Sequence, residues 1–299
     1  MTIQNEIKAW KKKRKAVILG HNYQRPEVQD ISDHLGDSLA LSVKATQTDA
    51  EVIVFCGVDF MAESAKVLNP EKIVLHPNLA AKCPMAAMMD VEGLRELKNE
   101  HPDAYVAGYV NTSAECKTEL DICCTSSNAV KVVSSLPEKE IIFIPDKNLG
   151  HYVSRFVRDK HFILFNGWCH VHNDITVEDV EKARSAHPHA LLLVHPECIP
   201  EVVDRADFIG STSQIIDYAV KSDGGEFVIG TESGILHRLT QLCPRKHFFK
   251  LSGLLVCPNM KKTSLQNICD ALEKMENRIE IDEKVKKGAA RSLNRMLSL

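Results

Sequence analysis

Short apolar runs alternate with helical patterns along the whole chain. Continuous apolar segments lie at 16–19, 52–55, 104–107, 141–144, 191–194 and 227–229, and further strands are predicted at 72–75, 161–165 and 247–251. Runs without polar alternation are typical of strands that helices cover on both faces. Between them, apolar residues recur at helical spacing, as at Leu39 and Val43. The alternation of strands and helices predicts parallel sheets with right-handed crossovers, which is an α/β fold.

This pattern occurs three times, and its polar positions keep one register. A polar triplet follows the first strand of each unit: His21-Asn22-Tyr23, Tyr109-Val110-Asn111 and His195-Pro196-Glu197. A hydroxyl residue lies 17 residues after the start of each triplet (Ser38, Ser126, Thr212), with an aspartate five residues before it (Asp33, Asp121, Asp207). A cysteine follows the start of each triplet by 62, 60 and 62 residues (Cys83, Cys169, Cys257). Such register indicates an ancient triplication.

We therefore expect three similar three-layer α/β/α domains with parallel sheets, related by pseudo-threefold symmetry around a common centre. The predicted boundaries are 1–87, 88–173 and 174–260, followed by a helical tail at 261–299. We expect this tail to pack against the first unit. The connections contain no low-complexity segment, so the three units should pack closely.

Composition narrows the function classes. The net charge of −3 gives no electrostatic argument for binding nucleic acid or membranes, and the basic run 11–15 is interpreted as a solvated helix end. No apolar run reaches the roughly 18 residues of a membrane span, and the start of the chain does not resemble a signal peptide, so we expect a cytoplasmic protein. In a reducing compartment the ten cysteines are expected to be ligands, catalytic groups or buried thiols.

The in-register positions predict one shared cavity. Ligands of parallel α/β sheets bind beyond the carboxyl ends of the strands, where the triplets and the cysteines lie. Ser38, Ser126 and Thr212 are predicted to be N-caps of three helices that point inward. Helix N-termini with a hydroxyl group bind carboxylate or phosphate, so the predicted ligand is a small polyanion.

Cys83, Cys169 and Cys257 are the only cysteines in register, so they can meet on the threefold axis. Thiolate ligation favours zinc or an iron–sulfur cluster. Zinc would take a further ligand such as His172, whereas a 4Fe–4S cluster on three cysteines would leave one iron open to substrate as a Lewis acid. The spacing does not decide between them. The other cysteines, including the adjacent pair Cys123-Cys124, are predicted to be buried thiols.

Several longer motifs resemble the quinolinate synthase family. They are Gly20-His21-Asn22-Tyr23-Gln24, Asp33 to Leu39, Gly57 to Glu63, Cys83-Pro84-Met85, Tyr109-Val110-Asn111-Thr112, Val194 to Cys198, Gly230-Thr231-Glu232 and Cys257-Pro258-Asn259-Met260. The resemblance covers nearly the whole chain. It implies three α/β domains around one cluster and a transferase of NAD biosynthesis. Such an enzyme condenses iminoaspartate with dihydroxyacetone phosphate to quinolinate, with loss of phosphate and water.

The resemblance also implies roles for individual residues. Cys83, Cys169 and Cys257 would hold an oxygen-sensitive 4Fe–4S cluster with one open iron. Substrate carboxylate and phosphate binding would fall to His21, Ser38, Ser126 and Thr212, and catalytic or substrate-binding positions to Tyr23, Tyr109, Asn111, His195 and Glu197. We expect Glu197 to be a general base, with Tyr109 and His195 as proton donors or orienting groups. Channelling of iminoaspartate from the enzyme that produces it is left open.

Three other readings share the three-cysteine pattern. A reductive dehydroxylase of isoprenoid synthesis and the tripartite radical enzyme of diphthamide synthesis explain neither Gly20–Gln24 nor Gly57–Glu63. A non-catalytic iron–sulfur or zinc protein would need neither Glu197 nor Tyr109. Alanine at either residue separates that reading from an enzyme.

Overall fold

A computed structural model describes residues 2–299 and contains three sheets of four parallel strands. The first is β2-β1-β3-β4, the second β6-β5-β7-β8 and the third β10-β9-β11-β12, so the three sheets share one strand order. The strands are β1 Ala16–His21, β2 His34–Gly36, β3 Val52–Cys56, β4 Ile73–Leu75, β5 Tyr105–Tyr109, β6 Ile122–Cys124, β7 Glu140–Ile144, β8 His161–Leu164, β9 Leu191–Val194, β10 Phe208–Ile209, β11 Glu226–Gly230 and β12 His247–Lys250. This threefold repetition confirms the predicted α/β fold class.

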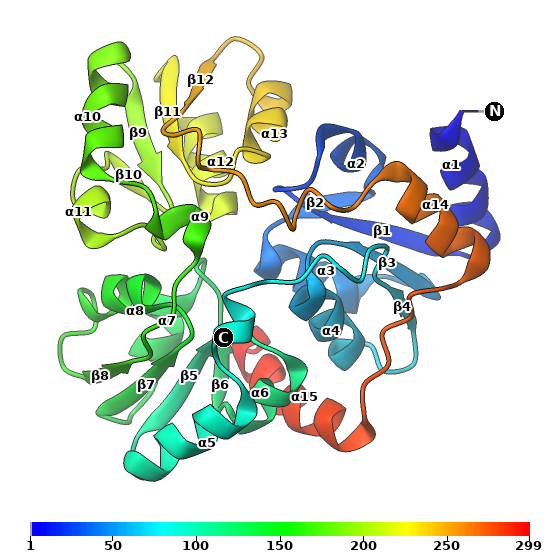
Figure 1. Cartoon of the computed structure of the whole chain (residues 1–299), viewed down its shortest axis with the longest axis horizontal. Helices are drawn as coiled ribbons and strands as arrows, with labels where there is room; N and C mark the ends of the chain where they lie inside the picture. Colours follow the sequence, from blue (N-terminus) through cyan, green and yellow to red (C-terminus); the bar gives the residue numbers. More distant parts are fainter. Residues whose placement is uncertain (1) are drawn as a thin grey trace.

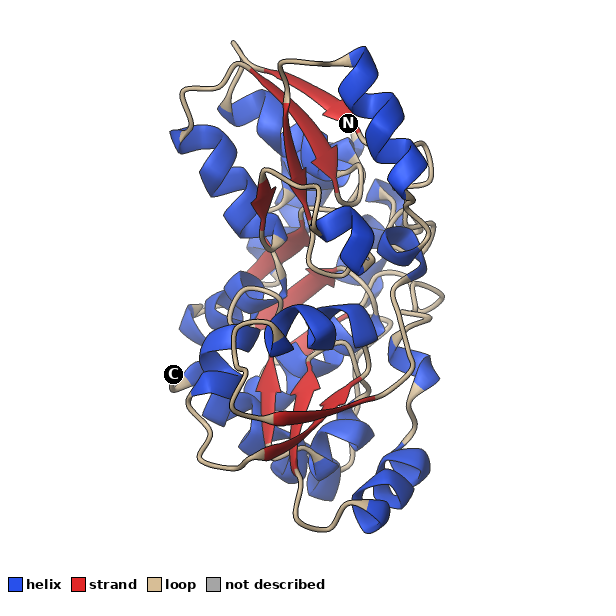
Figure 2. Ribbon diagram, turned by 90° about the vertical axis from the view of Figure 1, so that its left-hand side faces the viewer, coloured by secondary structure: helices blue, strands red, loops and turns tan. Residues whose placement is uncertain are grey.

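Helices surround each sheet, which explains the unbroken apolar runs of the central strands (Figure 2). The helices are α1 Ile3–Lys13, α2 Pro26–Ile31, α3 Ser38–Gln47, α4 Asp59–Leu68, α5 Val91–Glu100, α6 Ala114–Glu119, α7 Ala129–Ser134, α8 Lys147–Ser154, α9 His170–Asn173, α10 Val177–Ala186, α11 Pro200–Val203, α12 Thr212–Lys221, α13 Ile235–Leu242, α14 Leu265–Lys274 and α15 Glu283–Leu297, with a short 3₁₀ helix at Ala86–Met88. Every residue of β3 is buried, as expected for a strand covered on both faces.

The repeated aspartates have the same structural role in each unit. One carboxylate oxygen of Asp33, Asp121 or Asp207 accepts the backbone N–H of Ile18, Val106 or Leu192, at 2.8, 2.9 and 2.7 Å. Each bond fixes the start of the second strand against the first strand of its sheet. The register of these aspartates therefore reflects the construction of the unit.

Figure 1 shows the three sheets arranged around a common centre, with the second unit below the other two. The helical tail divides between two of them. Helix α14 packs on α1 of the first unit, whereas α15 lies against α6 and β6 of the second unit and also contacts α4 (Figure 1). The tail therefore packs on the first unit through α14, whereas α15 contacts that unit through α4 and the second unit more extensively. Its apolar face, with Ala289 and Leu293 fully buried, is covered mainly by the second unit.

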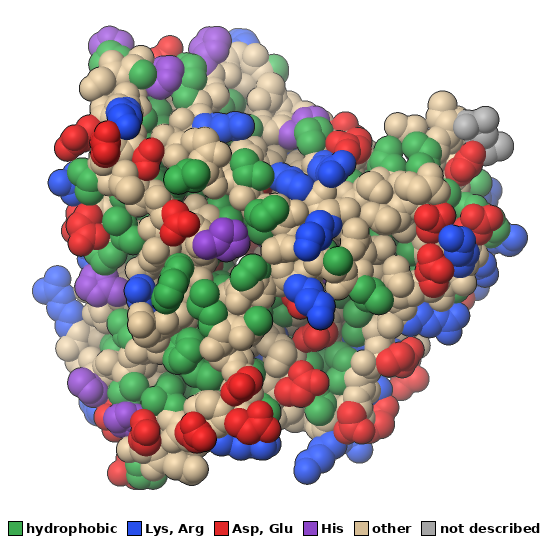
Figure 3. Space-filling view, viewed as in Figure 1, with side chains coloured by type: hydrophobic (Ala, Val, Ile, Leu, Met, Phe, Trp, Pro, Cys, Tyr) green, Lys and Arg blue, Asp and Glu red, His purple; other side chains and the backbone are tan. Residues whose placement is uncertain are grey.

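Charged side chains of both signs are scattered over the face seen in Figure 3, with exposed apolar side chains between them. No broad field of one sign covers that face. Among residues 2–299, none of the helices has both the length and the hydropathy needed to cross a lipid bilayer.

Candidate active site

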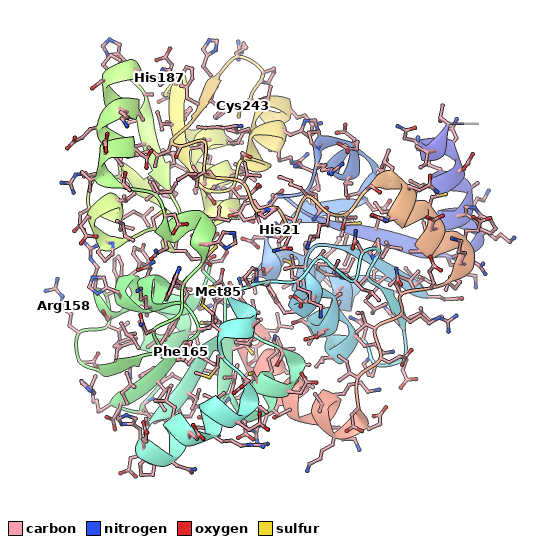
Figure 4. All side chains as sticks on the ribbon, in the orientation of Figure 1. His21, Met85, Arg158, Phe165, His187 and Cys243 are labelled. Carbon is pink, nitrogen blue, oxygen red and sulfur yellow. The ribbon has the colours of Figure 1, made fainter. Side chains whose placement is uncertain are left out.

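The three polar triplets lie at the carboxyl ends of β1, β5 and β9 and contribute to a single cavity. Its empty volume is about 740 Å³, counting the part open to solvent. All twelve residues predicted for the site line it: His21, Tyr23, Ser38, Cys83, Tyr109, Asn111, Ser126, Cys169, His195, Glu197, Thr212 and Cys257. Figure 4 shows the lining residues His21 and Met85 near the middle of the molecule, whereas Arg158 and His187 lie at its periphery.

Two histidines are held in the same way by their own triplets. Nδ1 of His21 accepts the backbone N–H of Tyr23 at 3.1 Å, and Nδ1 of His195 accepts that of Glu197 at 3.3 Å. An acceptor Nδ1 leaves the proton of the neutral ring on Nε2. Burial lowers the pKa of His21 to about 4 and that of His195 to about 3. Each neutral ring therefore offers an Nε2–H donor, and that of His195 donates to Oγ of Ser126 at 3.2 Å.

The three hydroxyl residues are not N-caps, so that expectation was wrong. Asp37 caps α3 through the Ala40 amide, and Ser211 caps α12 through the Gln214 amide. Ser38 and Thr212 are instead the first residues of these two helices. Because the preceding residue caps each helix, neither hydroxyl group is needed as a cap: that of Ser38 lines the cavity, and that of Thr212 donates to the Tyr23 hydroxyl group.

The second unit departs from the pattern. Helix α7 begins at Ala129, three residues after Ser126, and its N-cap position Asn128 makes no side-chain capping bond. The Asn128 side chain instead accepts from the backbone N–H and the hydroxyl group of Thr125. Only the first and third units therefore start a helix at the predicted hydroxyl residue.

The turns that carry these hydroxyl groups meet one another. The hydroxyl group of Ser127 donates to Asp37 at 2.8 Å and to Ser211 at 2.7 Å, and Ser211 also lies 3.2 Å from the Asp37 carboxylate. Because a hydroxyl group has one proton, Ser127 divides its donation between the two acceptors. This triangle joins all three units beside the cavity.

A chain of hydrogen bonds begins at Glu197 and ends at Thr212, both on the lining of the cavity. Its carboxylate lies 2.7 Å from Nδ1 of His172, and Nε2 of that ring lies 2.8 Å from the hydroxyl group of Thr231. The Thr231 hydroxyl group is 2.6 Å from the Tyr23 hydroxyl group, which accepts from Thr212 at 2.7 Å. Side chains from the first and third units are thus joined to His172, which follows the cysteine of the second unit.

Glu197 is ionised although it is buried. Burial by itself would raise its pKa, but His195, His172 and hydrogen bonds from His172 and Tyr109 lower it to about 2. The opposite holds for Tyr109, whose pKa is raised well above its usual value by burial and then by the Glu197 charge. Tyr109 is therefore a protonated donor beside a carboxylate. The pKa of Tyr23 is likewise raised, chiefly by burial.

The three in-register cysteines are half-buried free thiols, one from each unit, on the lining of this cavity. Burial raises the pKa of Cys83 to about 12, and the pKa of Cys169 and of Cys257 is also raised. Charges on Cys83 and Cys257 each contribute to the increase at Cys169. A bound cationic metal centre is what would keep three such groups ionised.

A second donor set overlaps with these thiols. Sγ of Cys169, a ring nitrogen of His172 and a carboxylate oxygen of Glu197 lie within 4.8 Å of one another and could hold a metal ion. The remaining cysteines do not line the described cavity, and Cys123 and Cys124 are buried on β6.

Sequence reasoning missed several residues that support the triplets, among them Gln29 and Lys117. The side-chain amide of Gln29 donates to the carbonyl groups of Asn22 and Gln24, at 3.0 and 2.9 Å. The fully buried Lys117 binds the carbonyl groups of Val110, at 2.8 Å, and Thr112.

Gln29 and Lys117 both lie eight residues after the first residue of their triplets, and that shared offset was the available signal. The shared offset was not recognised from the sequence because glutamine and lysine are chemically different residue types. The third unit has Val203 there, and Asn148 binds the carbonyl group of Glu197 at 3.0 Å instead.

Comparison with known proteins agrees with the geometry. Residues 5–298 match the family model described as "Quinolinate synthetase A protein". The chain is 52% identical over 295 residues to a "Quinolinate synthase" of Alkaliphilus metalliredigens, covering 99% of this chain and 97% of that protein. It is 53% identical over 298 residues to a "Quinolinate synthase" of Geobacter sp., covering 100% and 98%. Because the similarity extends over both full lengths, the chain belongs to the quinolinate synthase family.

Proposed function

We propose that this protein forms quinolinate from iminoaspartate and dihydroxyacetone phosphate, with loss of phosphate and water, in NAD biosynthesis. The observation that carries the proposal is the convergence of twelve residues from three units on one cavity. The full-length similarity to proteins named quinolinate synthase supports it. Both substrates are small and anionic, which suits a cavity with several hydroxyl and N–H donors.

We propose that Cys83, Cys169 and Cys257 hold a 4Fe–4S cluster. The donor set fits this group, because three free thiols line one cavity and no fourth cysteine does so within residues 2–299. When bound, such a cluster supplies a Lewis-acidic iron without a protein ligand. His172 would then be free to pair with Glu197 and Thr231.

A mononuclear metal on Cys169, His172 and Glu197 is the competing arrangement. It would break the 2.7 Å pairing of His172 with Glu197, because the same nitrogen or carboxylate oxygen would have to face the metal. It would also leave Cys83 and Cys257 without a role. Metal analysis separates the two arrangements.

Substrate anions would bind to the hydroxyl groups and to the imidazole N–H groups. Ser38 and Thr212 start helices, where amide dipoles add a favourable potential for carboxylate or phosphate. Asn111 adds an acceptor, since its buried Oδ1 has no hydrogen-bond partner. An imine N–H or hydroxyl group of a substrate would satisfy it.

Proton transfers would use Glu197, Tyr109, His195 and Tyr23. Glu197 is ionised and can therefore accept a proton, but a pKa of about 2 makes it a weak base while His172 and Tyr109 donate to it. We propose that substrate draws the Tyr109 proton away from Glu197, which strengthens the carboxylate as a base. Tyr109 would then act as the donor of the pair.

The experiment is anaerobic turnover of iron-loaded protein with dihydroxyacetone phosphate and iminoaspartate generated in the same vessel. We expect quinolinate, identified by mass spectrometry, and no product after Tyr109→Phe and Glu197→Gln together. Iron-loaded protein that makes no quinolinate would contradict the proposal. Because ten free thiols suit a reducing compartment, we propose that the reaction takes place in the cytoplasm. Direct transfer of iminoaspartate from its producing enzyme would appear as resistance to a trapping reagent.

A further inference from the structure

Each of the three cavity cysteines lies in a segment with little regular structure. Cys83 follows the end of β4 by eight residues, Cys169 follows β8 by five and Cys257 follows β12 by seven. Without other support, such segments would be too mobile to hold three thiols in one arrangement. The support must come from outside the segments.

In every unit, a carboxylate accepts the backbone N–H of the cysteine itself. Asp59 accepts from Cys83 at 3.0 Å, Asp146 from Cys169 at 3.0 Å and Glu232 from Cys257 at 3.1 Å. The carboxylates precede their cysteines by 24, 23 and 25 residues and follow the third strand of each sheet. They thus form a second in-register set, separate from Asp33, Asp121 and Asp207.

A backbone hydrogen bond accompanies each carboxylate. The N–H of Asp59 donates to the carbonyl of Ala81 at 3.0 Å. In the second unit Lys147 donates to Gly167 at 2.9 Å, and in the third Ser233 donates to Leu255 at 2.8 Å. The acceptor lies two residues before the cysteine each time. Two hydrogen bonds therefore tie every cysteine segment to the carboxyl edge of its own sheet.

All three carboxylates have a second partner, which for Asp59 is the Phe60 amide at 3.0 Å, and the other two carboxylates are completely buried. Asp146 also accepts the Leu149 amide at 2.8 Å, which caps α8. Glu232 accepts the Gly234 amide at 2.7 Å and pairs with Lys261 at 3.0 Å. In both cases one hydrogen bond fixes the carboxylate to the chain that follows the third strand, and another hydrogen bond holds the cysteine segment. Buried carboxylates need such partners, since burial without them is unfavourable.

We propose that Asp59, Asp146 and Glu232 are positioning residues that hold the three cysteines in the arrangement required by the cluster, one carboxylate for each ligand. This inference rests on the proposed cluster. The carboxylates would then act as the groups that orient the metal ligands through hydrogen bonds. Mutation of such groups typically weakens metal affinity by about 10- to 100-fold.

The test uses Asp59, which is only half-buried, with a control in the same unit. Asp59→Ala removes the acceptor for the Cys83 amide, whereas Asp59→Asn keeps one oxygen in place. Asp33→Ala is the matched control, because Asp33 also accepts a backbone N–H but from Ile18. Iron release from anaerobically loaded protein to a chelator is followed by absorbance. We expect release about 10- to 100-fold faster only for Asp59→Ala, with recovery in Asp59→Asn.

A second readout needs no metal. Alkylation of Cys83 by iodoacetamide in the metal-free protein, followed by mass spectrometry, should be faster in Asp59→Ala than in Asp59→Asn, which loses the same charge but keeps an acceptor oxygen, and unchanged in Asp33→Ala. If Asp59→Ala does not fold, Asp59→Ser replaces it, because the serine side chain is one atom shorter than that of aspartate and its oxygen does not occupy the position from which the carboxylate accepts the Cys83 amide. Equal behaviour of the carboxylate variant and its control in both measurements would overturn the inference. Wild-type protein that takes up no iron would instead count against the proposed cluster, and the alkylation result would still decide the positioning role.

Discussion

The cysteine segments and the hydroxyl turns border the same cavity, but they have kept different amounts of their threefold symmetry. All three cysteine segments share one design, in which a carboxylate and a backbone bond tie the segment to its sheet. The hydroxyl turns differ: helices begin at Ser38 and Thr212, whereas the second unit starts its helix at Ala129.

The difference matches the ligands that we propose for the two regions. Three cysteines bound to one cluster have equivalent tasks, so nothing favours divergence of their segments. A substrate with unlike ends has no threefold symmetry, so turns that contact it must become unlike. Repeats that surround a cofactor and a substrate should therefore stay alike at the cofactor and diverge at the substrate.

Removal of one of the three equivalent cysteines should have the largest effect on bound iron and on turnover. Cys169→Ala should lose bound iron and reduce quinolinate formation by more than about 100-fold, because two thiols hold a cluster poorly. The chain should still fold. Cys243→Ala is the control, since Figure 4 places Cys243 in the outer part of the third unit. Iron content and circular dichroism check both variants, and a full iron complement in Cys169→Ala would contradict the ligand assignment.

Glu197→Gln tests the part of the cavity that we propose contacts the substrate. The substitution keeps the shape and removes the negative charge that accepts protons, so turnover should fall by about 10²- to 10⁴-fold while iron content stays at the wild-type level. The measurement is kcat together with the visible spectrum. Near-normal turnover would rule out Glu197 as the base, and loss of iron would instead favour the metal site with Cys169 and His172.

Unequal effects of removing the three hydroxyl groups would show that the three turns no longer have equivalent functions. Ser38→Ala, Ser126→Ala and Thr212→Val each remove one hydroxyl group from the cavity lining. Each should weaken quinolinate binding by about 10- to 150-fold, corresponding to about 1.5–3 kcal/mol for a hydrogen bond to a charged group. Ser126→Ala also loses the bond from His195, and Thr212→Val also loses the bond to the Tyr23 hydroxyl group, so the three effects should be unequal. Titration calorimetry measures all three, and identical losses would argue that the turns are still equivalent.

The smallest expected effect concerns His76, a buried residue that does not line the cavity. Burial lowers its pKa to about 4 in the folded protein, against about 6.5 in an unfolded chain. Between these values only the unfolded chain is protonated, so the free energy of unfolding falls as the pH drops from about 6.5 towards about 4.

His76→Gln should therefore lose less stability than the wild type between about pH 7.5 and about pH 5. Urea denaturation of the metal-free protein measures the difference. His161→Gln, at an exposed position, is the control. Equal losses in wild type and His76→Gln would contradict the assignment of this acid sensitivity to His76.

Much of the fold could be predicted from the sequence because the repeats reinforced one another. An apolar run such as 52–55 is ambiguous alone, but three copies at matching positions predict a strand. The helix starts were harder to predict. Ser, Thr and Asp are all good caps, so adjacent candidates such as Asp37-Ser38 or Ser211-Thr212 cannot be ranked from sequence. The place of α15 depends on which apolar faces remain uncovered after folding.

The site residues in register were brought together as expected, and their individual roles remain proposals. Residues that support them were missed for a physical reason. Gln29 and Lys117 act through backbone carbonyl groups, which have no sequence signature. Asp59, Asp146 and Glu232 vary in spacing by a residue or two and mix two side-chain lengths. Their equivalence becomes visible only when the acceptor atoms are located.

We propose that the three equivalent cysteines hold one cluster whose open iron faces the substrate cavity. The most direct test is iron and sulfide analysis of anaerobically prepared protein, with visible and electron paramagnetic resonance spectra before and after addition of quinolinate. We expect about four irons and four sulfides per chain and a spectral change when quinolinate binds. One zinc per chain, or no metal, would contradict it.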